Sequence, residues 1–228
     1  MDGKPYDFQY KSLPYKSKAQ LINLLTIPEH AVATHVNSGD IVIDGDFSDW
    51  TEDGNISLAT NESVKETSGA DSWNGPYDCS ICLRLRWDES FLYIAARILD
   101  DNIVYPESPK DAYTRDCLEI FIKTNTIFQG LFFPYDNNYS GPKAWWIQKA
   151  SDIGTKVACK FIPNGYQLEI AIPWSELDHH PQKGDKLPFT FHLNDSDKPG
   201  QFRKTLMIWK GDGLNYKSPT QWGDLLLK

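Results

Sequence analysis

The chain has 228 residues, enough for one large or two small all-β domains with a hydrophobic core. Its net charge of −8, without any Lys/Arg cluster, excludes the basic face that nucleic-acid binding requires. No apolar run approaches the ~20 residues that a transmembrane helix needs, so no transmembrane helix is expected. Aromatic residues make up 13% of the chain, more than a core of this size needs, which indicates that some rings are exposed and face a ligand or a partner.

Residues 1–36 differ from the rest and are expected to form an N-terminal extension. Their Pro and Tyr residues suggest an extended arm, and residues 17–27 have the pattern of a short helix that Pro28 ends. No leader sequence is visible, so we expect either a cytoplasmic protein or the mature form of an exported one.

From Asp40 onward, period-two alternation and turn residues predict a series of strands. A long loop is expected over residues 61–75 and one helical turn over residues 173–177. The fold class is therefore all-β, an antiparallel β-sandwich of the jelly-roll or immunoglobulin-like kind over residues 37–228. The expected strands cover residues 41–43, 79–87, 91–98, 117–123, 145–149, 155–162, 166–172, 189–194, 205–209 and 223–227.

Glu119 lies in the middle of an apolar strand. With a period of two, its even-numbered neighbours face one side and Glu119 faces the other with Cys117 and Phe121. A carboxylate on a half-apolar face needs a partner. The sequence leaves two interpretations open: an acceptor for a ligand hydroxyl, or a structural partner of an arginine such as Arg97.

Two paired carboxylates would instead make a glycosidase. No spacing fixes a pair among the candidates, and no G-x-S-x-G motif accompanies the five histidines, so binding is favoured over catalysis and no catalytic residue is assigned. The candidate carboxylates are Glu119, Glu169, Asp100, Asp101 and Asp116.

The four cysteines are expected to be buried strand residues. Cys79 and Cys82 form a C-x-x-C motif, but the residues after it alternate as a strand, whereas a redox motif precedes a helix. Cys117 and Cys159 stand alone, which disfavours a zinc site. Three tryptophans within strand patterns are likewise expected in the core: Trp87, Trp174 and Trp209.

Three acidic turns, at residues 44–46, 100–101 and 195–197, offer the loop oxygens that Ca²⁺ prefers. None has EF-hand spacing, and each is also a good turn in its own right. One structural Ca²⁺ is compatible with the sequence, and no other cofactor is expected.

Five segments in order carry a resemblance to a known family. They are I-V-I-D-G-D at 41–46 with Trp50, L-R-W-D-E at 85–89 with L-Y-I-A-A at 92–96, R-D-C-L-E-I-F-I at 115–122, G-Y-Q-L-E-I-A-I-P-W at 165–174, and L-N-D at 193–195 with Trp209 and W-G-D-L at 222–225. Together they resemble the family 9 carbohydrate-binding modules.

This resemblance implies a non-catalytic β-sandwich that clamps a sugar between two aromatic rings. It places Tyr113 and Tyr216 at the ring positions, where the family typically has Trp, and Glu119 at the ligand-contacting glutamate. Trp146 or Gln148 takes the place of the family's ligand-facing arginine. Two further polar positions are matched by His192 and Arg203.

The resemblance also implies partners and a location. The partners would be an oligo- or polysaccharide and a linked or neighbouring glycoside hydrolase, in a secreted, periplasmic or cell-surface setting. Two alternatives stay open: a glycoside hydrolase or lyase on the same sandwich, and a structural module without a sugar site, which the change of both family tryptophans to tyrosine would favour.

Overall fold

The computed structural model describes residues 27–53, 56–67 and 73–228. Four short 3-10 helices punctuate this part of the chain: η2 (Phe47–Asp49), η3 (Asn61–Ser63), η4 (Pro109–Thr114) and η5 (Trp174–Leu177). The strands are β1 (His30–His35), β2 (Ile56–Leu58), β3 (Val64–Thr67), β4 (Cys79–Trp87), β5 (Phe91–Asp100), β6 (Cys117–Lys123), β7 (Ile127–Phe132), β8 (Ala144–Trp146), β9 (Lys156–Ile162), β10 (Gly165–Pro173), β11 (Lys186–Asp195), β12 (Thr205–Ile208) and β13 (Gly223–Leu227). Within the described ranges, no helix has the length and apolar content needed to cross a membrane.

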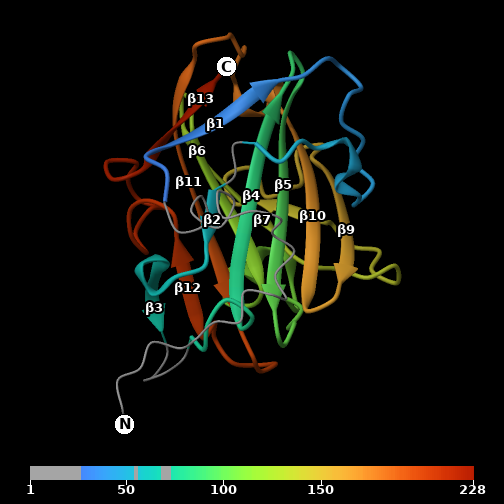
Figure 1. The fold of residues 1–228 in the computed structure, drawn as a ribbon, viewed down its shortest axis with the longest axis vertical. Coiled ribbons are helices and arrows are strands. Elements are labelled where there is room, and N and C mark those ends of the chain that lie inside the picture. Colours follow the sequence, from blue (N-terminus) through green and yellow to red (C-terminus); the bar gives the residue numbers. More distant parts are fainter. Residues whose placement is uncertain (1–26, 54–55, 68–72) are drawn as a thin grey trace.

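These strands form one continuous sheet that folds over on itself. Along its main path the order is β8-β7-β6-β11-β13-β1-β4-β5-β10-β9, with β12 beside β11, β3 beside β12 and β2 beside β4. Figure 1 shows β4, β5, β10 and β9 in front of β6 and β7. The two layers share one core, which contains Ile120 and Ile122 of β6 together with Ile94 of β5 and Ile170 of β10. The expected β-sandwich is therefore confirmed.

Alternation within the strands sorts side chains between this core and the outer faces, as period two requires. In β6, Leu118, Ile120 and Ile122 are completely buried in the shared core, while Glu119 points away from it. Trp87, Trp174 and Trp209 are each at most 3% exposed and belong to the same core, as expected. The four cysteines occupy strands, but only Cys79 in β4 and Cys117 in β6 are buried as expected, whereas Cys82 in β4 and Cys159 in β9 are partly exposed.

Strand β1 lies in the middle of the sheet, although its residues were assigned to the extension over residues 1–36. It pairs in parallel with both β13 and β4, with Ala31 opposite Leu225 and Ala33 opposite Leu85. The sandwich therefore begins before residue 36, and it is not purely antiparallel. The helix expected over residues 17–27 lies outside the described residues except for its last position.

The strand expected over residues 41–43 does not form. Ile41 is buried and Val42 exposed, so the predicted alternation is present, but carboxylates rather than a neighbouring strand accept the local backbone hydrogen bonds. Asp49 accepts from the Val42 amide at 2.7 Å. The segment expected to be a loop, residues 61–75, contains η3 and β3. Strand β7 was not expected from the sequence.

Glu169 is the buried acceptor that fixes this first segment to β10. Its Oε2 accepts hydrogen bonds from the backbone amides of Asp44, at 2.9 Å, and Gly45. Its Oε1 accepts from the indole Nε1 of Trp50 at 2.7 Å. Because buried donors without an acceptor cost free energy, the segment around Trp50 depends on this carboxylate.

We expect Glu169→Gln to lower the free energy of unfolding by about 2 kcal/mol, because the new amide group turns a donor toward donors that a carboxylate satisfied. Urea denaturation measures the change. Glu89→Gln, at a side chain that is 75% exposed, is the matched control and should stay within about 0.5 kcal/mol of the wild type. Equal effects of the two substitutions would contradict this role for Glu169.

Candidate functional site

The outer side of β6, β7 and β11 carries polar side chains that contact one another. We call Glu119, Gln129, His192, Asn194 and Arg203 the polar face. Glu119 lies on β6, Gln129 on β7, and His192 and Asn194 on β11, while Arg203 precedes β12. His192 is directly opposite Glu119 in the β6–β11 ladder, so the sheet register itself brings two of the expected site residues together.

Glu119 is only 3% exposed and is held by two amide donors. Gln129 Nε2 donates to its Oε2 at 2.8 Å, and Asn194 Nδ2 donates to its Oε1 at 2.7 Å. The arginine suggested as a structural partner, Arg97, lies instead in the other layer, where its guanidinium is 5.8 Å from the Phe47 ring centroid. The amides of Gln129 and Asn194 therefore help to hold this carboxylate in one orientation.

Arg203 joins the polar face to η4. Its Nη1 donates to Asn194 Oδ1 at 3.0 Å and to the backbone carbonyl of Tyr113 at 3.4 Å. Since Asn194 also bonds Glu119, a chain of contacts runs from the Glu119 carboxylate to the helix that carries the Tyr113 ring. The position of that ring is thus tied to the floor of the polar face.

His192 lies below the surface as a neutral imidazole. Its Nε2 is 2.8 Å from Nδ2 of Asn215, an amide nitrogen that can only donate, so Nε2 accepts. Its ring centroid is 4.5 Å from that of Phe121. Burial, assisted by the positive charge of Arg203, lowers the pKa of His192 to about 3. His192 therefore positions neighbouring groups and does not carry charge at neutral pH.

Three aromatic rings near the polar face remain open to solvent. Tyr113 on η4 is 36% exposed, and Tyr216, between β12 and β13, is 49% exposed. Phe202 is 57% exposed, with the Arg203 guanidinium 4.9 Å from its centroid. Exposure of Tyr113 and Tyr216 meets the first requirement for ring stacking on a ligand.

Trp146 and Gln148 were the two candidates for the place of the family's ligand-facing arginine, and the structure puts them in different environments. Trp146 has no exposed surface and packs against Phe128 and Phe132 in the core, so its expected role as a ligand contact is wrong. The outward position of β8 is held by its neighbour Trp145. Gln148 is exposed beyond the end of β8, and its Oε1 accepts from the Gln129 backbone amide at 2.7 Å, which places it beside the polar face.

Sequence reasoning missed Gln129, Asn194 and Asn215. Asn194 could have been found, because it lies two residues after His192 on one strand and must share its face. Gln129 also alternates with apolar residues in β7. Asn215 comes from a loop, and no local pattern indicates that it reaches His192.

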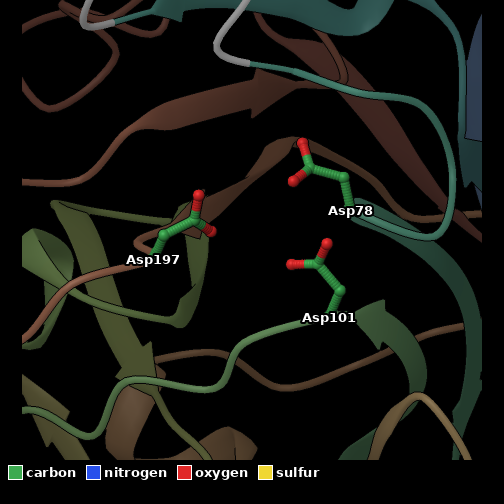
Figure 2. Close-up of side chains that lie close together, drawn as sticks. All are labelled: Asp78, Asp101 and Asp197. Carbon is green, nitrogen blue, oxygen red and sulfur yellow. The ribbon is translucent and has the colours of Figure 1, made fainter.

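At one end of β6 and β11, six aspartates form two adjoining groups. The inner acidic cluster consists of Asp100, Asp116 and Asp195, all buried, and the outer acidic cluster of Asp78, Asp101 and Asp197. In each cluster one oxygen per residue lies within 4.8 Å of the others. Figure 2 shows the outer carboxylates converging. Two of the three acidic turns expected to offer metal ligands thus meet here, whereas residues 44–46 lie against Glu169.

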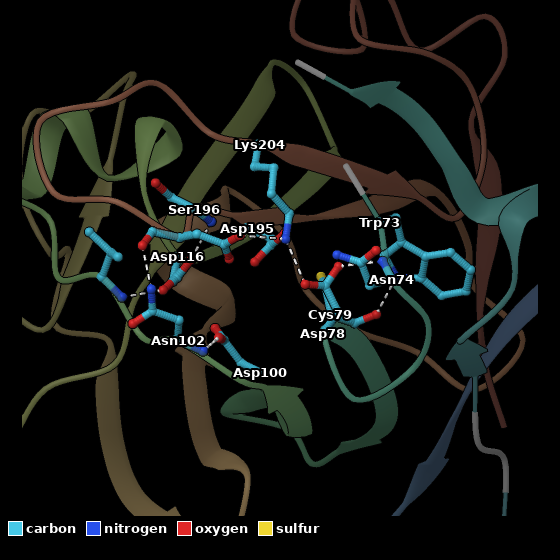
Figure 3. A network of polar contacts seen from close by, with 12 residues as sticks. Trp73, Asn74, Asp78, Cys79, Asp100, Asn102, Asp116, Asp195, Ser196 and Lys204 are labelled. Atoms are coloured by element: carbon cyan, nitrogen blue, oxygen red, sulfur yellow. Dashed lines mark hydrogen bonds and ion pairs between the residues drawn. The ribbon is translucent and has the colours of Figure 1, made fainter. Parts of the chain in front are cut away.

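Lys204 supplies positive charge to the outer cluster. Its Nζ lies 2.6 Å from Asp78, 2.8 Å from Asp197 and 3.6 Å from Asp195. Figure 3 shows Lys204 reaching toward Asp78 and Asp195. In the inner cluster, Asp116 accepts from the backbone amides of Val104 and Ser196. The two clusters are therefore neutralised to different extents.

Both carboxylate oxygens of Asp195 lack a hydrogen-bond donor among the described residues, although Asp195 is 1% exposed. The buried hydroxyl groups of Tyr166, Ser196 and Thr205 also lack a hydrogen-bond partner among the described residues. Burial raises the pKa of Asp100 to about 6 and that of Asp195 to about 8, and raises the pKa of Asp116 well above its ordinary value. This concentration of buried oxygens is the arrangement that a bound cation would satisfy.

The chain belongs to the carbohydrate family 9 binding domain-like family, whose profile matches residues 43–228. It is 28% identical over 196 residues to the endo-1,4-beta-xylanase A of Thermoanaerobacterium saccharolyticum, and 28% identical over 232 residues to that of Thermotoga neapolitana. These alignments cover 83% and 99% of this chain but 15% and 20% of the xylanases. The chain therefore spans a fifth or less of the length of these relatives.

Solved structures share the fold. A family 9 carbohydrate-binding module from Caldicellulosiruptor kristjanssonii in complex with glucose superimposes with a TM-score of 0.64 at 20% identity, over 86% of this chain and 94% of that one. A module from the same organism in complex with cellotriose gives a TM-score of 0.63 at 20% identity, over 87% of this chain and 93% of that one.

Because His192 is neutral in the folded protein, we expect the free energy of unfolding to depend on pH. An unfolded histidine binds a proton below about pH 6.5, whereas folded His192 stays neutral down to about pH 3, so stability is lost as the pH falls through this window. We expect the wild type to lose about 2 kcal/mol more than His192→Gln between pH 7 and pH 4.5.

Urea denaturation at the two pH values measures this difference. His180→Gln, at an exposed histidine, is the control and should retain the wild-type dependence. An unchanged pH dependence in His192→Gln would show that this imidazole is accessible to protons in the folded state.

Proposed function

We propose that the polar face of this family 9 domain binds a sugar without catalysing a reaction on it. The observation that carries the proposal is the Glu119 carboxylate, fixed by Gln129 and Asn194 and linked through Arg203 to the exposed Tyr113. A pyranose has apolar C–H faces and a polar rim, so rings and oriented polar groups act on different parts of it. The arrangement therefore supplies both kinds of contact.

In this proposal Tyr113 and Tyr216 stack on the sugar, and Glu119 accepts a hydrogen bond from a hydroxyl group. Gln148 and Arg203 act at the edge, and His192 supports the floor. Trp146 is removed from the contact set because it lies in the core. Tyrosine rings are smaller than the tryptophan rings typical of the family, so weaker stacking is expected.

The carboxylates considered for hydrolysis are used elsewhere in the fold. Asp100 and Asp116 lie in the inner acidic cluster, and Glu169 anchors the segment around Trp50 in the opposite layer. Glu119 is flanked by amides. These contacts support binding rather than an acid–base pair across a glycosidic bond, which needs two carboxyl groups at a set separation.

The relatives suggest the setting in which this binding operates. Since the named relatives are xylanases of which this chain matches only a part, we propose that it accompanies a glycoside hydrolase outside the cytoplasm. Its ligand would be a neutral plant polysaccharide chain of β-1,4-linked sugars, in line with the cellotriose and glucose bound by the structural neighbours.

We also propose that the inner acidic cluster holds a structural Ca²⁺. Calcium takes six to eight oxygen ligands, and here Asp100, Asp116 and Asp195 offer carboxylates beside buried hydroxyls such as those of Tyr166 and Thr205. The ion would neutralise carboxylates that otherwise keep protons. Because Asp116 immediately precedes β6 and Asp195 ends β11, the ion would brace the two strands that carry Glu119 and His192.

For sugar binding, we expect Tyr113→Ala and Tyr216→Ala each to lower the affinity for cello- or xylo-oligosaccharides at least about tenfold, because each removes a stacking surface. Glu119→Gln should have an effect of similar size through loss of a charged acceptor. Isothermal titration calorimetry measures all three.

Tyr77→Ala is the matched control, since Tyr77 is 40% exposed and outside the polar face, and its affinity should equal that of the wild type. Absence of heat with every oligosaccharide, in the presence of Ca²⁺, would overturn the sugar-binding proposal and favour a structural module. Release of new reducing ends from polysaccharide by the pure chain would favour a hydrolase.

For the cation, we expect Ca²⁺ at about 100 times its Kd to stabilise the protein by about 3 kcal/mol, which raises Tm by roughly 5–10 °C. The effect should be larger at pH 8 than at pH 5, because protons on Asp100 and Asp195 compete with the ion. Differential scanning calorimetry with Ca²⁺ and with EDTA measures it.

Asp116→Asn should abolish the response to Ca²⁺. Asp44→Asn, in the acidic turn outside the cluster, should keep it. A Tm that is independent of Ca²⁺ and EDTA at both pH values would rule out a stabilising cation.

A further inference from the structure

An aromatic pocket of about 250 Å³ lies apart from the polar face, between the β5–η4 loop and the β7–β8 loop. We call it the aromatic pocket. Four rings line it, those of Tyr105, Phe133, Tyr135 and Tyr139, together with two prolines. Ligand pockets for drug-sized molecules occupy about 300–1,000 Å³, so this volume suits a single six-membered ring.

The aromatic side chains that line the pocket pack against one another and against a buried cluster. Phe133 is buried in a small cluster with Ala112, Cys117 and Leu131, and none of the residues that line the pocket belongs to the polar face. The rings of Tyr135 and Tyr139 are 6.1 Å apart, and those of Phe133 and Tyr139 are 6.0 Å apart at 90°. The pocket is therefore preformed and separate from the site around Glu119.

The hydroxyl groups of two of the pocket's tyrosines form hydrogen bonds with backbone carbonyls. Tyr135 OH donates to the Val157 carbonyl at 2.8 Å, and Tyr139 OH donates to the Pro142 carbonyl at 3.0 Å. Their rings can thus offer only apolar faces. Lys143 Nζ lies 4.7 Å from the Tyr135 ring centroid, which anchors that ring further.

The polar groups of the pocket are gathered at Tyr105, Asp136 and Asn138. Asp136 and Asn138 are exposed, and Tyr105 is 48% exposed, with its ring 6.4 Å from that of Phe161. Burial and the nearby charge of Asp136 raise the pKa of Tyr105, so its hydroxyl stays protonated and can donate or accept. The pocket combines apolar walls with a carboxylate, an amide and a hydroxyl at its mouth.

We propose that the aromatic pocket is a second sugar-binding site, which holds one neutral pyranose of the polysaccharide that the polar face also binds. The half-exposed ring of Tyr139 contacts a C–H face above a floor formed by the buried Phe133 and Tyr135, and Tyr105 and Asp136 bind hydroxyl groups. Asp136 and the net charge of −8 disfavour an anionic ligand such as a uronate or a phosphate.

This inference rests on the proposed function, and it adds a consequence for binding to polymers. Two weak sites on one rigid domain raise the apparent affinity for a chain that reaches both, or for a surface that presents many chains, without any new contact. Monosaccharides gain nothing from this arrangement, since they occupy each site independently.

The test uses the full chain with insoluble cellulose and xylan, with cello- and xylo-oligosaccharides, and with glucose. We expect Tyr105→Ala to lower the affinity for the insoluble polysaccharides at least about tenfold, while glucose still binds the polar face within about twofold of the wild-type affinity. Tyr105→Phe should fall between, because it keeps the ring and loses the hydroxyl. Tyr77→Ala is the matched control for loss of an exposed tyrosine.

An NMR titration of the Tyr113→Ala/Tyr216→Ala double variant isolates the second site. Oligosaccharide should still shift the backbone amides of residues 133–139, except for the proline at position 134, and should not do so once Tyr105→Ala is added. If the double variant shows no shifts at these amides and Tyr105→Ala binds polysaccharide like the wild type, the second site is refuted and the polar face stands. If wild-type protein binds no sugar in any assay, both proposals fall.

Discussion

Strand β6 divides its side chains between two environments, and the other parts of the molecule depend on that division. Its even-numbered residues lie in the core that joins the two layers, and Glu119 faces outward. Asp116, directly before the strand, belongs to the inner acidic cluster. Core, polar face and acidic cluster therefore share about eight residues of backbone, so a shift of one residue in register would disturb all three.

Several carboxylates are buried in this fold, and each burial costs free energy unless a partner satisfies the carboxylate. The partners differ from one carboxylate to the next. Glu169 is satisfied by backbone amides and an indole, Glu119 by two side-chain amides, and the outer acidic cluster by Lys204. Asp195 is the exception, because neither of its oxygens accepts a hydrogen bond from a described residue. A structure that satisfies its other buried carboxylates so fully makes this exception informative.

Local pattern predicted the bounds of several strands whose side chains alternate between turn residues, whether or not their partners are close in the sequence. The bounds of β4, β6 and β13 match the expected ranges, and β5 and β10 differ by one or two residues at their ends, because tight turns and period two act within short stretches. β1 was missed because its partners lie about 50 and 190 residues further along the chain. The strand over residues 41–43 was wrong because nearby carboxylates accept its amide hydrogens, which alternation does not reveal.

The same limits apply to the site. Glu119 and His192 share the polar face because ladder register follows from alternation, whereas Trp146 was placed on the wrong side of β8, where adjacent residues face opposite ways. Tyr113, Tyr216 and Arg203 came from the family resemblance, and their role in ligand contact stays a prediction. Gln129 was missed because β7 itself was not predicted, and Asn215 lies beyond any short-range signal because it reaches His192 from a loop.

The central position of β1 has a consequence for how the domain reaches this structure. β1 is held between β4 and β13, and the His35 amide donates to the carbonyl of Lys228, so its pairing requires residues near position 228. During synthesis, residues 30–35 must therefore wait for nearly two hundred further residues before one of their two ladders can form. Contacts of such long sequence separation slow folding, and the exposed edge of β1 has to be kept from other chains until β13 is available to pair with it.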